Sequence, residues 1–165
     1  MLKPDHTTLD NIKIIVCAWL ICGSLDILSA FTDYYIKTGK GPGDLLKYVA
    51  SGVFGEEAFG DSGIMIWAGL LFHFIIAFIF TLLFFILYPR VKLLQFNVFI
   101  TAIIFGMIVW AIMNLIVVPL SNTPRPASGQ RHIIKPLLIL ICMIGLPLSI
   151  IYKRYFRSYV STYTI

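Results

Sequence analysis

The stretch Ile64–Tyr88 reads IMIWAGLLFHFIIAFIFTLLFFILY, and it decides the fold class of this chain. It contains one side chain that can carry a charge near neutral pH, that of His73. At ~1.5 Å per helical residue the stretch is roughly 37 Å long, enough to cross the ~30 Å hydrocarbon core of a bilayer. A helix in water does not need an apolar surface on every side, so the stretch predicts a transmembrane helix.

The composition of the whole chain points to the same class of protein. Of its 165 residues, 59% are hydrophobic and only 13% are charged, and the mean hydropathy is +0.90. Such values are typical of membrane proteins. The formal net charge is +5, but the thirteen lysines and arginines are scattered over the sequence. We therefore expect membrane lipids to be the partners of these basic residues, and we expect no binding of nucleic acid.

Three further apolar stretches are long enough to cross a bilayer, and they cover residues 12–36, 96–120 and 133–152. Pro147 lies inside the last of them and predicts a kink, because proline removes one backbone hydrogen bond from a helix. The connection between the second and third spans, residues 89–95, is short. We therefore expect these two spans to be antiparallel neighbours.

The longer connection between the first two spans contains a weaker helical pattern. Over residues 44–59 apolar side chains recur at helical spacing with polar ones between them. The segment is too short and too polar to cross the membrane. One interpretation is an amphipathic helix that lies in the membrane interface. The alternative is a re-entrant hairpin that turns at residues 50–52.

Together these segments predict an all-α integral membrane protein, with residues 1–165 forming a single membrane domain. The architecture is a four-transmembrane-helix bundle with an interfacial or re-entrant helix between spans one and two. The spans are expected at about residues 12–36, 64–88, 96–120 and 133–152, and the additional helix at about 44–59. An even number of spans places both termini on the same side as the loop 89–95. That loop and the C-terminal flank concentrate basic residues next to span ends, so the positive-inside rule predicts cytoplasmic termini.

Three polar side chains lie well inside the predicted spans, those of Asp26, His73 and Asn114. Asp26 lies ten residues before the end of span one, and His73 lies ten residues after Gly63, where span two begins, so both are about 15 Å from the same membrane face. Asn114 lies six residues before the end of span three, about 9 Å from that face. A polar group at such depth should face protein or water and not lipid.

Small side chains flank the first two of these polar residues along one face of each helix. They are Ala18, Cys22 and Ala30 around Asp26, and Gly69, Ala77 and Thr81 around His73. Small residues let two transmembrane helices approach closely. We therefore expect Asp26 and His73 to come within reach of each other, with Asn114 completing an intramembrane polar cluster.

Two interpretations of this cluster remain open. In the first it is a buried set of paired groups that specifies which helices pack together, and the protein is a small accessory or structural subunit. It would then act through helix packing with itself, as a homo-oligomer, or as a subunit of a larger membrane complex. In the alternative the cluster is a polar site for a proton, an ion or a small solute, and the protein is an oligomeric transporter or channel-like protein.

Other kinds of site have little support in the sequence. No Ser/His/Asp triad or pair of catalytic carboxylates stands at a recognisable spacing. His73 has no second histidine inside the membrane, and the three cysteines lie in apolar segments without a C-x-x-C motif. We therefore predict no catalytic residue, no metal and no cofactor, and we do not expect an enzyme.

Basic residues next to the spans are candidates for contact with anionic lipid headgroups. They lie in the loop after span three and at the end of span four, and they are Arg125, Arg131, Lys153 and Arg154. A solvated connection is the alternative interpretation of the loop.

The order of several motifs resembles one known family. His73 is followed by an aromatic-rich run, by the sequence YPRVKL at residues 88–93, and then by Gly106 and a Pro119-Leu120 pair. This order resembles the YagU-like family of small bacterial inner-membrane proteins with four spans. The similarity covers spans two and three, about a third of the chain. The resemblance implies a location in a bacterial inner membrane, and it implies no particular reaction.

Overall fold

The structure, a computed structural model, describes residues 8–124 and 133–160. Within these ranges the chain is helical and forms no strand. Four helical stretches are long and apolar enough to cross a membrane, and they are Asp10–Thr38, Ile64–Leu87, Val98–Leu120 and Ile134–Tyr155. The predicted fold class, an all-α bundle of four transmembrane helices, is therefore confirmed.

The first two spans are unbroken helices, whereas the last two each contain a π-helical segment. The unbroken helices are α1 (Thr8–Thr38) and α3 (Ile64–Leu87). The third span consists of α4 (Val98–Ile112), the π segment η3 (Met113–Val117) and α5 (Val118–Leu120). The fourth consists of α6 (Ile134–Leu140), the π segment η4 (Ile141–Gly145) and α7 (Leu146–Val160). Each π segment ends two residues before a proline, Pro119 or Pro147, so the widened turn lies where the proline interrupts the helical hydrogen bonds.

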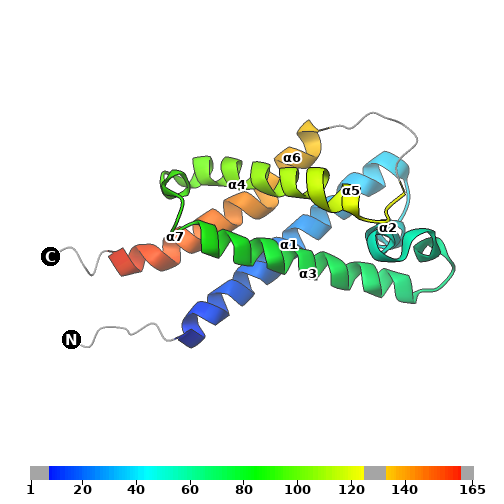
Figure 1. Ribbon diagram of the computed structural model, residues 1–165, viewed down its shortest axis with the longest axis horizontal. Helices are drawn as coiled ribbons and strands as arrows, with labels where there is room; N and C mark the ends of the chain where they lie inside the picture. The colour runs from blue at the N-terminus through cyan, green and yellow to red at the C-terminus, as the bar shows by residue number, and fades with distance from the viewer. Residues whose placement is uncertain (1–7, 125–132, 161–165) are drawn as a thin grey trace.

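Two ends of the bundle can be distinguished in Figure 1. The start of α1, the end of α7 and the short 3₁₀ turn η2 (Lys92–Gln95) lie at one end. There the Tyr155 hydroxyl donates to Oδ1 of Asn11 at 3.3 Å, and Lys153 Nζ donates to the carbonyl of Phe96 at 3.2 Å. At the other end lie α2 (Pro42–Phe54) and the 3₁₀ turn η1 (Gly55–Phe59). We call these the terminal end and the α2 end.

Helix α2 runs across the spans, and Figure 1 shows it almost end-on while the spans are seen from the side. It is helical without a break from Pro42 to Phe54, so the re-entrant hairpin that turns at residues 50–52 is wrong. The orientation agrees with the interfacial alternative. The helix buries Leu46, Ala50 and Ser51 and exposes Val53, an amphipathic pattern that suits a membrane surface.

Contacts with two other parts of the chain hold α2 in place. It lies so close to α3 that a Cβ atom at Gly69 would overlap with the carbonyl group of Leu46. At its C-terminal end, the backbone N–H of Asn122 donates to the carbonyl of Gly52 at 3.0 Å, and Nδ2 of Asn122 donates to that of Val53 at 3.1 Å. These carbonyls have no partner inside the helix, so Asn122 supplies the missing donors.

Helix α4 packs on the fourth span through glycine. A Cβ atom at Gly106 would lie 2.5 Å from Cγ1 of Ile141, and one at Gly145 would overlap with the carbonyl group of Ala102. The absence of these two side chains therefore lets the backbones approach closely. The predicted neighbours α3 and α4 run antiparallel (Figure 1), and they meet where the Phe84 and Phe105 rings stand edge to face, with centroids 4.8 Å apart.

Candidate functional site

Two hydrogen bonds join α1 and α3 near the middle of the two spans. Nε2 of His73 donates to the carbonyl of Gly23 at 2.9 Å, and Nε1 of Trp19 donates to the carbonyl of Phe74 at 2.7 Å. Because a carbonyl oxygen only accepts hydrogen bonds, the hydrogen of the first bond must be on Nε2. The two helices exchange one bond in each direction: Trp19 and Gly23 lie one turn apart on α1, and His73 and Phe74 are adjacent on α3.

Aromatic contacts surround these bonds. The Trp19 indole stands edge to face with the rings of Phe74 and Phe78, at centroid distances of 6.1 and 5.3 Å. Gly23 contributes by its small size, because a Cβ atom there would lie 3.0 Å from the Phe74 ring. The α1 residues that contact α3 are thus Trp19 and Gly23, each one position after a member of the predicted small-residue row. Ala18 and Cys22 of that row are buried, and the Cys22 thiol approaches the backbone of Leu148 in the fourth span.

Asp26 lies one turn of α1 beyond Gly23, towards the α2 end, and its carboxyl group is close enough to His73 to interact with it electrostatically. No hydrogen bond or ion pair joins the Asp26 and His73 side chains among the described residues. The third residue of the predicted cluster lies elsewhere. Asn114 is part of the π segment η3, and its Nδ2 donates to the carbonyl of Trp110 in the same span at 3.0 Å. Within the described residues it makes no hydrogen bond to Asp26 or His73.

The residues predicted to contact anionic lipids fall into two groups. Arg125 and Arg131 lie outside the residues that the structure describes. Lys153 and Arg154 line a small pocket of about 200 Å³ at the terminal end, with Val98 and Ile150 as its apolar walls. The pocket combines two cations with an apolar surface, the features that an anionic lipid requires.

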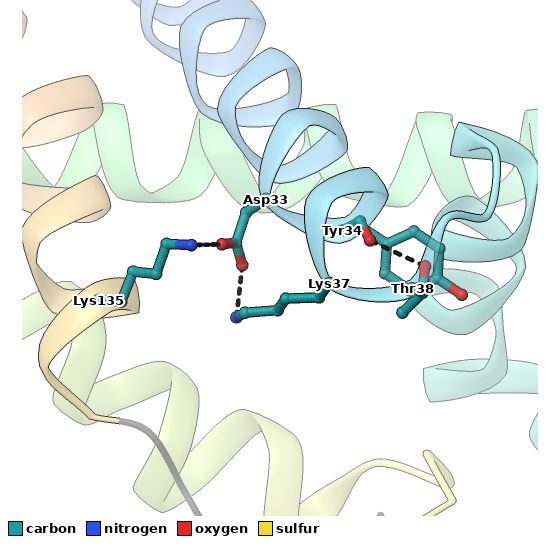
Figure 2. Close-up of polar contacts among 5 residues, drawn as sticks. All are labelled: Asp33, Tyr34, Lys37, Thr38 and Lys135. Atoms are coloured by element: carbon teal, nitrogen blue, oxygen red, sulfur yellow. Dashed lines mark hydrogen bonds and ion pairs between the residues drawn. The ribbon is translucent and has the colours of Figure 1, made fainter.

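A charged cluster near the α2 end was missed by the sequence analysis. The carboxylate of Asp33 in α1 lies between two ammonium groups, and Figure 2 shows both ion pairs. Lys37 Nζ lies 2.6 Å from Oδ2, and Lys135 at the start of α6 pairs with Oδ1. Only 17% of the Asp33 side chain is exposed, whereas the two lysine side chains are about half exposed. The spacing of four residues between Asp33 and Lys37 is a signal for a helical ion pair, but nothing local in the sequence points to Lys135.

Asp33 and Lys135 of this cluster line the mouth of a groove of about 440 Å³ between α1 and the fourth span, and Lys37 lies beside it through its ion pair with Asp33. We call it the α1–α6 groove. Apart from Asp33 and Lys135 its walls are mainly apolar, and they are formed by Leu25, Leu28, Ser29, Thr32, Ile36, Ile139 and Met143. The groove is therefore charged at one end and apolar along the rest of its walls.

No protein-family model, no curated protein and no solved structure matches this chain. The resemblance to the YagU-like family accordingly stays a prediction. The helices themselves define a class, that of the small multi-pass α-helical membrane proteins with four spans.

Proposed function

We propose that this chain is a small accessory or structural subunit of a bacterial inner membrane, and that it acts through helix packing with itself or with a larger membrane complex. The observation that carries the proposal is that the His73 side chain forms a hydrogen bond inside the chain. Its Nε2 hydrogen is committed to the Gly23 carbonyl, so the imidazole joins two helices of the chain itself. Trp19 does the same in the opposite direction. The proposal assigns no chemical reaction to the chain.

The distribution of charge supports an orientation with both termini in the cytoplasm. Among the residues whose side chains are described, the terminal end carries five basic groups and one acid, namely Lys13, Arg90, Lys92, Lys153, Arg154 and Asp10. The α2 end carries four lysines and five acids, namely Lys37, Lys40, Lys47, Lys135, Asp33, Asp44, Glu56, Glu57 and Asp61. Basic residues next to span ends favour the cytoplasmic side, so the terminal end is the better candidate for that side.

Native mass spectrometry of the protein extracted from its own membrane tests the accessory role. We expect a stoichiometric second copy or a stoichiometric protein partner. A monomer that carries only lipid would overturn the proposal, because such a protein has nothing to pack against in the membrane.

A second candidate function, that of an oligomeric transporter or channel-like protein, is favoured by the proximity of Asp26 to His73. Ionisable groups at this depth are found on ion and proton pathways in other membrane proteins. Proton flux into proteoliposomes separates the two functions. If the pair only holds helices together, Asp26→Asn and His73→Gln should lower thermal stability and leave flux at the level of protein-free vesicles. A flux that exceeds this level in the wild type and is lost in both variants would favour transport, and Asn114→Leu serves as the control because Asn114 bonds within its own span.

A further inference from the structure

We propose that the α1–α6 groove binds one anionic phospholipid of the surrounding membrane, with the headgroup phosphate at Lys135 and Lys37 and one acyl chain along the groove. This inference does not depend on the accessory role proposed above. It rests on the charge at the mouth of the groove, on the chemistry of its walls and on its length.

The mouth of the groove has an excess of positive charge. One carboxylate, that of Asp33, is shared by two ammonium groups. Each ammonium group has three hydrogens, so donors remain after both ion pairs have formed. The side chains of Lys37 and Lys135 are 44% and 52% exposed, which leaves these donors open to a ligand at the membrane surface. An oxyanion is the complementary ligand, and lysines at a membrane surface attract anionic headgroups.

The two hydroxyl groups in the walls do not make the groove polar. Ser29 Oγ donates to the carbonyl of Asp26 at 2.8 Å, and Thr32 Oγ1 donates to the carbonyl of Leu28 at 2.9 Å. Both hydroxyl hydrogens are therefore used within α1. The remaining wall residues are hydrocarbon or thioether side chains. Such a surface suits an acyl chain better than a polar solute.

The length of the groove matches one leaflet. Along α1 the lining begins at Ile36, beyond the ion pairs. From the ion pairs inward it runs from Asp33 to Leu25 on α1 and from Lys135 to Met143 on the antiparallel fourth span. Each interval is eight residues, or about 12 Å of helix, and one leaflet contributes about 15 Å of the hydrocarbon core. The volume of 440 Å³ is within the range of about 300–1,000 Å³ that small-molecule sites occupy. A chain anchored at the ion pairs therefore reaches close to the middle of the bilayer.

Native mass spectrometry of the detergent-solubilised chain, titrated with palmitoyl-oleoyl phosphatidylglycerol or with phosphatidylcholine of the same acyl chains, tests this proposal. We expect one phosphatidylglycerol to bind more tightly than phosphatidylcholine. Lys135→Gln should weaken phosphatidylglycerol binding about fivefold, the usual effect of one lysine at a membrane surface. Asp33→Asn should strengthen it by a similar factor, because it removes the competing carboxylate. A change that merely unfolded the groove could not produce this gain.

Two further variants separate the headgroup from the acyl chain. Lys40→Gln removes an exposed lysine from the same end but outside the groove, so it should leave binding unchanged. Ser29→Leu should fill the groove and weaken binding, whereas Ile103→Phe on the exposed face of α4 should not. Glycerol phosphate alone should bind far more weakly than the whole lipid. The proposal fails if the two lipids bind equally, if Lys135→Gln behaves like Lys40→Gln, or if a photoreactive side chain at Leu28 crosslinks in the membrane to a protein instead of a lipid.

Discussion

Gly69 is the position at which one added methyl group should do most to separate α2 from α3. In Gly69→Ala the new Cβ atom would lie 2.7 Å from the carbonyl carbon and 3.1 Å from the Cα atom of Leu46. Carbon atoms in contact are about 3.5–4.0 Å apart, so α2 must move by roughly 1 Å. Both atoms of Leu46 belong to the backbone and cannot rotate away, as a flexible side chain could.

The expected loss of stability follows from two opposing contributions. Overpacking of a tight contact costs about 1–3 kcal/mol, and the rigid partner places this substitution near the upper value. Alanine in place of glycine inside a helix stabilises the helix by about 1 kcal/mol. The net change is therefore a destabilisation of about 2 kcal/mol, or a fall of about 4–8 °C in the Tm of a chain of this length.

Thermal unfolding in detergent, followed by far-ultraviolet circular dichroism, measures the change. Gly63→Ala is the matched control, because a Cβ atom there has no atom within 4 Å. A local readout comes from Ser51→Cys, a buried position on α2 that should react faster with an impermeant maleimide when Gly69→Ala is also present. The reasoning is refuted if Gly69→Ala is as stable as Gly63→Ala and the label at residue 51 reacts no faster.

Three other changes test separate features. Gly145→Ala should lower the Tm by a similar amount, because its Cβ atom would lie 3.0 Å from Cα of Ala102 in the neighbouring span; the thermal unfolding measurement applies here too. Trp19→Phe keeps an aromatic ring and loses the bond to the Phe74 carbonyl, so equilibrium unfolding in mixed micelles should show a loss of about 0.6 kcal/mol, the average for such bonds in a membrane. Burial raises the pKa of Tyr88 above its ordinary value, so its phenol stays neutral in the fold at a pH at which the unfolded chain ionises. Stability should therefore fall as the pH rises above about 10, and a plot of Tm against pH should be flatter for Tyr88→Phe.

The sequence was sufficient for the fold class because length and hydropathy alone determine which segments can cross a bilayer. Depth along a helix was also predictable, since each residue adds a fixed rise, and it suggested a cluster of Asp26, His73 and Asn114. The acceptor of the His73 hydrogen bond was not predictable. It is a backbone carbonyl, that of Gly23, and a sequence pattern contains no signal for the rotation that points a side chain at one carbonyl of a neighbouring helix.

The position of Asn114 shows that depth along a span does not by itself predict which way a side chain points. A row of residues four apart, Ala102, Gly106, Trp110 and Asn114, stays on one helix face only while the helix is regular. The π segment η3 contains Asn114 and widens the turn, so the row does not continue in register to the end of the span. In the sequence, Pro119 was the signal for this irregular turn. The pairing of Asp33 with Lys135 could not be predicted for a different reason, since it depends on how α1 and α6 meet, more than one hundred residues apart in the sequence.

The capping of α2 by Asn122 has a consequence for the order in which the chain assembles. The acceptor at Val53 and the donor at Asn122 are 69 positions apart, and the whole of the second and third spans is synthesised between them. Until the third span has entered the membrane, the carbonyls at the end of α2 can bind only water, and the docking of α2 on Gly69 can form before the contact with Asn122. In a nascent chain that ends before Asn122, the C-terminal end of α2 should therefore lack its hydrogen-bond donors and be accessible to proteases on that side of the membrane. Completion of the third span would then be the step that closes this end of the protein.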